Sequence, residues 1–143
     1  MMDTAKIQQY IEKVDLFKGL TQDEVAKIFA KGMTMRCVKG EVLFYQGTIG
    51  SQMYVLLGGK VGVFEGEKPI ATLTPGAMFG EMALVNKEPR SATVRALEDS
   101  RVFVLSESTF EKLLTKRVAI RILLNIISTL SLRLKDSNAR VVG

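Results

Sequence analysis

The chain has 143 residues, of which 47% are hydrophobic and 24% are charged, so it has the length and composition of one globular domain that buries a core. It contains no histidine, which excludes a Ser-His-Asp or Cys-His catalytic site and makes a histidine-ligated metalloenzyme hard to build. The net charge of +5 comes from basic residues spread along the chain, whereas a nucleic-acid-binding arm usually clusters them.

The single cysteine and the start of the chain indicate the cellular compartment of the protein. Cys37 has no second cysteine with which to form a disulfide, and no apolar leader with a cleavage site opens the sequence. We therefore expect a cytoplasmic, reducing location. The apolar stretch at residues 118–132 is interrupted by polar residues and is shorter than the roughly 20 residues that span a bilayer, so it predicts a packed helix.

Two short helices are predicted within residues 1–32. Over the first fourteen residues, apolar side chains recur at helical spacing, at Ile7, Tyr10, Ile11 and Val14. A second helix is predicted at residues 22–31, because Thr21 followed by Glu24 has the form of a capping box. We expect the first helix to pack on the edge of the main body and the second to bury Val25, Ile28 and Phe29.

Residues 33–105 are typical of a β structure, because short apolar or alternating runs are separated by glycines. The clearest predicted strands are residues 42–45, 53–57, 61–64, 70–73, 92–96 and 101–105. Their spacing of about ten residues favours a sandwich, barrel or jelly roll. We expect an α+β domain with an eight-stranded jelly-roll barrel (a double-stranded β-helix) and flanking helices.

Residues 106–143 return to helical periodicity and are expected to hold a short helix followed by a long one at about residues 117–140. Along the long helix, apolar residues are separated by alternating threes and fours, and one serine interrupts them: Ile120, Leu123, Ile127, Leu130, Leu134, Ser137 and Val141. This is the seam pattern of a coiled coil. We therefore expect a parallel homodimer formed through residues 117–141.

Residues 75–94 are the segment that indicates a ligand. Pro75 and Gly76 predict a turn, and residues 79–84 then form a short, glycine-led, helix-prone stretch. The first N–H groups of such a stretch, beginning at Gly80, have no helical partner, so an anion can bind there.

Three side chains near this turn narrow the chemistry of the ligand. Arg90 precedes a predicted strand and can offer a fork of donors to a phosphate, and Ser91 adds a hydroxyl beside it. Glu81 would repel a phosphate unless it faces another part of the ligand, and a sugar hydroxyl is the natural partner. The set suits a ribose phosphate that carries a single negative charge.

This pattern resembles the phosphate-binding cassette of the cyclic nucleotide-binding domain family. The resemblance extends over most of the chain, through residues 16–20, 39–41, 46–47, 57–59 and 75–94. It implies that Glu81 accepts the 2′-hydroxyl of the ribose and that Arg90 pairs with the cyclic phosphate. It also implies backbone or hydroxyl donors at Gly80, Ala83 and Ser91.

In bacterial activators of this family, polar residues of the dimerising helix contact the purine, and Ser137 and Asn138 match that place. The resemblance implies a non-catalytic sensor that binds cAMP or cGMP, needs no cofactor or metal, and acts on an unidentified downstream protein. Because the sequence stops at Gly143, directly after the long helix, we expect no DNA-reading module unless the sequence is part of a longer regulator.

Purely structural roles remain as alternatives to ligand binding for the same residues. Glu81 could be a helix-start acid, Arg90 a surface base, and Ser137 a residue that sets the register of a coiled coil. A β-barrel enzyme of the cupin type is a rival that the lack of histidine argues against. A dimerisation or scaffold module without a ligand is a second rival, and retention of both Glu81 and Arg90 argues against it.

Overall fold

The computed structural model describes residues 4–81, 87–113 and 116–142. Its helices are α1 (Thr4–Lys13), the short 3₁₀ helix η1 (Asp15–Phe17), α2 (Gln22–Lys31), α4 (Glu107–Leu113) and α5 (Lys116–Val142). Its strands are β1 (Met33–Cys37), β2 (Val42–Phe44), β3 (Gln52–Gly58), β4 (Val61–Glu65), β5 (Lys68–Leu73), β6 (Met78–Phe79), β7 (Thr93–Ala96) and β8 (Ser100–Ser106).

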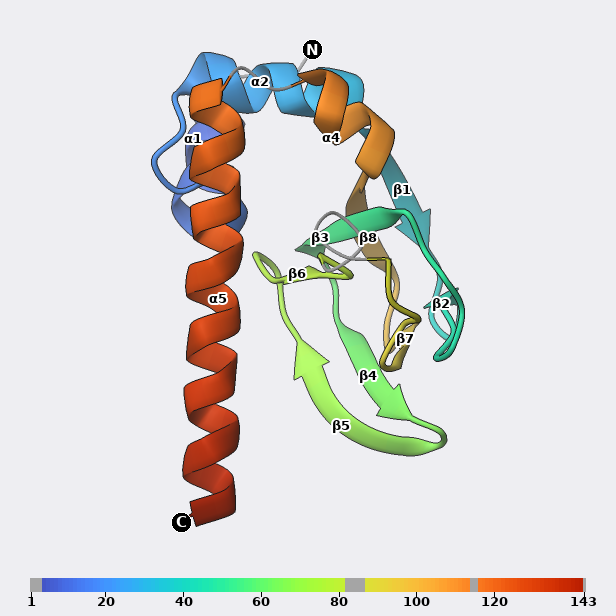
Figure 1. Ribbon diagram of the computed structural model, residues 1–143. Coiled ribbons are helices and arrows are strands. Elements are labelled where there is room, and N and C mark those ends of the chain that lie inside the picture. Colours follow the sequence, from blue (N-terminus) through green and yellow to red (C-terminus); the bar gives the residue numbers. More distant parts are fainter. Residues whose placement is uncertain (1–3, 82–86, 114–115, 143) are drawn as a thin grey trace.

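The strands of the described residues form two four-stranded antiparallel sheets (Figure 1). The first sheet has the order β1-β8-β3-β6 and the second the order β2-β7-β4-β5. No strand pairing between described residues joins the sheets, so the structure shows two sheets where the sequence predicts a closed barrel. The six strands singled out in the sequence are confirmed as β2, β3, β4, β5, β7 and β8.

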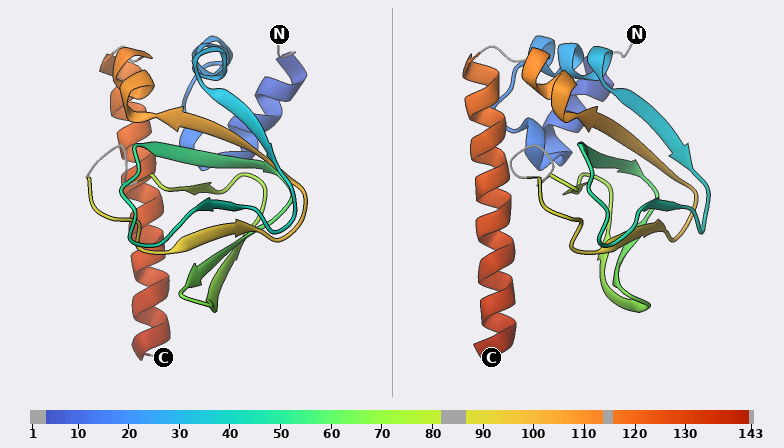
Figure 2. Two further views of the ribbon diagram at one scale, coloured as in Figure 1. Left: turned by 90° about the vertical axis from the view of Figure 1, so that its right-hand side faces the viewer. Right: turned by 45° about the vertical axis from the view of Figure 1, so that its right-hand side comes forward.

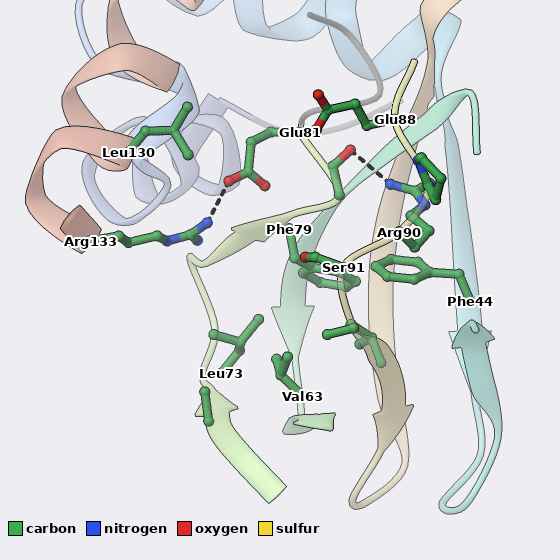
Figure 3. A pocket seen from close by; sticks show the side chains of 15 residues that line it. Phe44, Val63, Leu73, Phe79, Glu81, Glu88, Arg90, Ser91, Leu130 and Arg133 are labelled. Carbon is green, nitrogen blue, oxygen red and sulfur yellow. Dashed lines mark hydrogen bonds and ion pairs between the residues drawn. The ribbon is translucent and has the colours of Figure 1, made fainter. Parts of the chain in front are cut away.

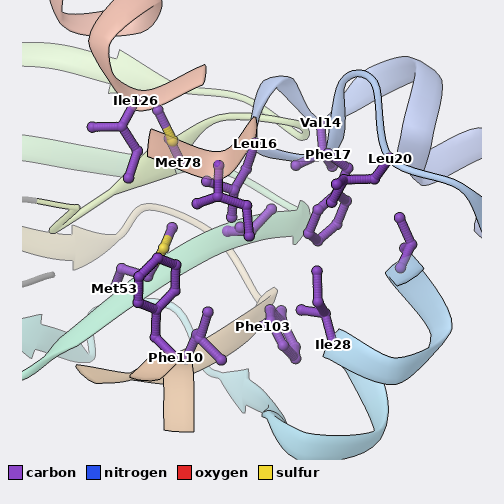
Figure 4. Packing of buried hydrophobic residues seen from close by; sticks show 14 of the residues in the cluster. Val14, Leu16, Phe17, Leu20, Ile28, Met53, Met78, Phe103, Phe110 and Ile126 are labelled. Carbon is purple, nitrogen blue, oxygen red and sulfur yellow. The ribbon is translucent and has the colours of Figure 1, made fainter. Parts of the chain in front are cut away.

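Two apolar cores lie on opposite faces of the first sheet. Between the sheets, buried residues of both pack together: Cys37, Tyr54, Leu56, Val61, Phe79, Val94, Ala96, Val102 and Val104. On the other face, Met53, Val55 and Phe103 pack against residues of η1, α2, α4 and α5 (Figure 4). Because both faces are covered, β8 is a nearly continuous apolar run rather than an alternating one.

The helices gather at one end of the sheets, and α5 runs from there along the side of the body (Figures 1 and 2). The capping box of α2 is confirmed, since Thr21 Oγ1 accepts from Glu24 N and Glu24 Oε1 accepts from Thr21 N. Among the described helices, none combines the length and the hydropathy that crossing a bilayer requires.

The first half of α5 is fixed to the body. Val118, Ile122 and Ile126 are buried in the core on the helical side. Asn125 is also buried, and its Nδ2 donates to the carbonyl oxygens of Leu16 at 2.8 Å and Lys18 at 2.9 Å. The opposite side of the helix is apolar too, but it is exposed at Ile120, Leu123, Leu124, Ile127 and Leu134.

Candidate functional site

A cavity of about 430 Å³ opens between the second sheet, β6 and α5 (Figure 3). Its volume lies in the range of pockets that hold small molecules. Its lining is largely apolar, with two acidic and two basic side chains: Phe44, Val63, Ala71, Leu73, Phe79, Gly80, Glu81, Glu88, Pro89, Arg90, Ser91, Ala92, Val94, Leu130 and Arg133.

Arg90 is the buried cation of this cavity, with 8% of its surface exposed. Its Nη1 donates to the carbonyl oxygen of Gly80 at 3.0 Å and its Nη2 to that of Gln52 at 2.6 Å. The guanidinium carbon lies 4.2 Å from the centre of the Phe44 ring. Nε is buried and has no hydrogen-bond partner among the residues that the structure describes. The guanidinium is therefore held in place by two backbone carbonyl groups and an aromatic ring.

The charge of Arg90 is also poorly solvated. Burial lowers the pKa of its guanidinium, and the charges of Tyr54 and Glu81 act in the opposite direction and raise it. An arginine stays protonated in proteins despite such a shift, so the pocket contains a fixed positive charge in a region of low polarity. Such a charge with an unpaired donor suits an anionic ligand.

Two glycines make room for this arginine. Gly80 has a φ of +71°, and a Cβ atom there would lie 2.7 Å from Arg90 Nη1. A Cβ atom on Gly50 would collide with the Arg90 guanidinium as well. The positive φ and the close approach together explain why a residue without a side chain stands at position 80.

Glu81 is the second buried charged group, with 3% of its surface exposed. It forms an ion pair with Arg133, which reaches it from α5 (Figure 3). Arg133 Nη2 also donates to the carbonyl oxygen of Met78 at 2.7 Å. The carboxylate is thus tied to the long helix, a connection that the sequence analysis missed. A possible signal was the position of Arg133, one helical turn before Ser137.

Four of the predicted site residues come together in the structure, since Gly80, Glu81, Arg90 and Ser91 all line the cavity. Ser91 itself is exposed at its edge. Ala83 lies outside the described residues. The backbone at positions 137 and 138 belongs to α5, but the side chains of Ser137 and Asn138 are not among those that the structure describes.

Other contributors were not recognised from the sequence. The ring of Phe44, the carbonyl group of Gln52 and the space at Gly50 all hold Arg90 in place, although they come from segments about forty residues earlier in the chain. Any residue has a backbone carbonyl group, and glycine occurs at many turns, so neither Gln52 nor Gly50 could be recognised from a single sequence.

Comparison with known families identifies the domain. Residues 34–117 match the family model of the cyclic nucleotide-binding domain. The chain belongs to this family. The match runs from the second residue of β1 through β8 into the start of α5, and it includes every residue of the cavity lining except Leu130 and Arg133.

The relatives of this cyclic nucleotide-binding domain are regulators and receptors. It is 34% identical over 107 residues to a cAMP-dependent protein kinase regulatory subunit of Hypocrea atroviridis, covering 75% of this chain and 23% of that one. It is 31% identical over 128 residues to a cyclic AMP receptor protein of Thermus thermophilus, covering 86% of this chain and 58% of that one. The chain therefore spans less than two thirds of either relative.

A solved structure shows the same fold. The crystal structure of the Thermus thermophilus catabolite activator protein superimposes with a TM-score of 0.78 at 30% identity, and the match covers 89% of this chain and 61% of that one. The two antiparallel sheets and few helices described above are thus those of the cyclic nucleotide-binding domain.

Proposed function

We propose that this chain is a regulatory domain that binds cAMP in the cavity between the second sheet and α5. The observation that carries the proposal is Arg90, a buried cation that lines a cavity of about 430 Å³ and whose Nε has no hydrogen-bond partner in the described part of the chain. The two relatives, a cAMP-dependent protein kinase regulatory subunit and a cyclic AMP receptor protein, support cAMP over other anions.

In this proposal the phosphate binds at Arg90. Arg90 and Ser91 both line the cavity and supply guanidinium and hydroxyl donors, and backbone groups at Gly80 and Ala83 complete the set. The Phe44 ring under the guanidinium keeps it in place when a ligand competes for its donors. A cyclic phosphate carries one negative charge, which matches a single buried arginine.

The ribose and the base of the nucleotide occupy the rest of the cavity. Glu81 accepts the 2′-hydroxyl of the ribose, and the base lies against the apolar side chains of the second sheet, such as Val63 and Leu73. Ser137 and Asn138 contact the purine from α5. These assignments extend the contacts described above, in which Glu81 already has a partner on α5.

Binding then signals through α5. Glu81 pairs with Arg133, so a ribose hydroxyl that donates to the same carboxylate competes with the arginine or shares the carboxylate with it. Either arrangement changes what holds the second half of the helix. A ligand shifts an equilibrium only through contacts that differ between two states, and this ion pair supplies such a contact.

We also propose that the domain forms a parallel homodimer through residues 117–141. Four of the seam residues, Ile120, Leu123, Ile127 and Leu134, are exposed in the single chain, on the side of α5 opposite its buried residues. Exposed apolar residues aligned along one helix face favour pairing with a second helix. Residues 1–32, 33–105 and 106–143 are, in this view, the helical, nucleotide-binding and signalling parts of one non-catalytic cytoplasmic domain.

Isothermal titration of the full chain, stripped of bound nucleotide, with cAMP and with cGMP in parallel tests the proposal. We expect one site per chain and tighter binding of cAMP. Replacing Arg90 with alanine removes the partner of a buried phosphate and should cost about 2–5 kcal/mol of binding free energy.

Arg95 provides a matched control for this substitution. Its guanidinium carbon lies 4.4 Å from the centre of the Phe64 ring, which resembles the Arg90 arrangement, but it does not line the cavity. Arg95→Ala should leave the dissociation constant within about threefold. No heat with either nucleotide would instead favour the scaffold module, and equal losses in both variants would remove Arg90 from the site.

A further inference from the structure

The four edges of the two sheets differ in how well they are protected against pairing with another strand. β6 has two residues, and β2 has three with a register shift against β7. β5 carries Pro69, which lacks an N–H group, and its register against β4 also shifts. Short strands, bulges and prolines are the usual means of blocking an edge.

β1 has none of these three features. It is five residues long, contains no proline or glycine, and pairs with β8 in unbroken register from Met33 to Cys37. Among the described residues it is the end strand of the first sheet, and four of its five residues are exposed. Its outer backbone edge is therefore a template to which another extended chain can add.

Apolar side chains accompany this free edge. Met33 is 58% exposed, Met35 is 37% exposed and Val38, directly after the strand, is 54% exposed. None of the three lines the nucleotide cavity. An added strand would cover part of this surface, which gives its binding an apolar contribution besides the backbone hydrogen bonds.

The charges beside the edge indicate the chemistry of the added strand. Arg36 stands directly opposite Arg101 in the register of β1 and β8, and both side chains are exposed. Neither forms an ion pair with any residue that the structure describes within 4.0 Å. Like charges directly opposite each other destabilise a strand pair, and a carboxylate placed on the other side of Arg36 would offset this repulsion.

We propose that β1 binds an acidic, extended segment of a partner protein, which joins the first sheet as a fifth strand with a carboxylate opposite Arg36. A second copy of this chain fits the edge less well, because pairing β1 with β1 would bring a second set of Arg36 and Arg101 charges to the same place. This surface is independent of the nucleotide cavity, so it holds whether or not cAMP is the ligand.

Binding of designed peptides to the full chain tests this inference. The probes are fluorescein-labelled Val-Thr-Val-Glu-Val-Thr-Val and the same peptide with lysine in place of glutamate, followed by fluorescence polarisation. We expect the glutamate peptide to bind about fivefold more tightly, the scale of one cross-strand charge pair. Arg36→Glu should reverse the preference for the glutamate peptide. Arg36→Gln should abolish this preference, and it serves as the test if the glutamate variant does not fold.

Two controls locate the binding. N-methylation of alternate residues of the glutamate peptide removes the N–H donors along one of its backbone edges and should abolish binding. With the unmethylated peptide bound, hydrogen exchange of the chain's backbone amides should slow within β1. Lys68→Glu changes an exposed charge on the proline-protected edge of β5 and should leave the preference for glutamate unchanged.

Several results would overturn the proposal. These are equal binding of the two peptides, a preference that survives Arg36→Glu, slowed exchange on another edge strand, and no binding of either peptide at millimolar concentration. If Arg36→Gln causes only self-association of the chain, then the arginine merely keeps the edge from aggregating, and the acidic partner is rejected as well.

Discussion

The two halves of α5 are held to the body in different ways. The first half buries Val118, Ile122 and Ile126 in the core, and Asn125 donates to two carbonyl groups beside η1. Arg117 adds a hydrogen bond to the carbonyl oxygen of Gly19 and an ion pair with the capping glutamate of α2. These contacts lie away from the cavity.

The second half touches the body mainly at the cavity. Leu130 is partly buried there, and Arg133 contacts Glu81 and the carbonyl oxygen of Met78. The other side chains described from position 131 to position 136 are exposed. The first half is therefore held by apolar burial and hydrogen bonds away from the cavity, whereas the polar contacts described for the second half lie at the cavity.

The largest expected effect comes from truncating the buried side of the first half. Ile122 is fully buried, so Ile122→Ala should lower the free energy of unfolding by about 2–5 kcal/mol through lost burial and a cavity. Urea unfolding measures the change.

Ile127→Ala is the matched control on the exposed side of the same helix, where 61% of the surface of Ile127 is exposed. It should cost less than about 0.5 kcal/mol in the monomer. It should nevertheless weaken self-association in sedimentation experiments, because Ile127 belongs to the proposed dimer seam. If both substitutions destabilise the monomer equally, the two sides of α5 do not differ as described.

A double-mutant cycle of Glu81→Gln and Arg133→Met tests what holds the second half of the helix. Because the two side chains are in direct contact and the carboxylate is buried, we expect a coupling energy of about 0.5–3 kcal/mol in urea unfolding. Amide exchange should accelerate after residue 130 in either single variant and stay unchanged around Asn125. A coupling energy near zero would mean that the ion pair does not hold the helix.

The smallest effect concerns pH and the start of α5. The hydrogen bond from Arg117, followed by that from the Thr21 backbone, lowers the pKa of Glu24 below its ordinary value of 4.5. An acid with a lowered pKa in the folded state stabilises the fold above its ordinary pKa, and this contribution is lost as the pH falls through the folded-state value.

Glu24→Gln should therefore cost less than about 1 kcal/mol at pH 7, because Arg117 is largely exposed. The difference from the unchanged chain should shrink as the pH falls below 4.5. Urea unfolding of both proteins at several pH values measures this trend, and a difference that grows in acid would contradict the assignment.

Local patterns in the sequence determined much of this protein. The apolar runs between glycines predicted six strands, Thr21 and Glu24 predicted the start of α2, and periodicity predicted the long helix. The residues around Gly80 and Arg90 predicted a place for an anion, and both line the cavity. These features depend on hydrogen bonds and spacings within a few residues, so a single sequence carries them.

Tertiary structure decided which distant groups meet. Arg133 reaches Glu81 from 52 positions later in the chain, and the Gln52 carbonyl reaches Arg90 from 38 positions earlier. The separation into two sheets instead of a closed barrel, and the bare edge of β1, likewise depend on how strands from the whole chain pair. Such contacts follow from packing of the complete chain, and no local pattern encodes them because each partner alone is an ordinary residue.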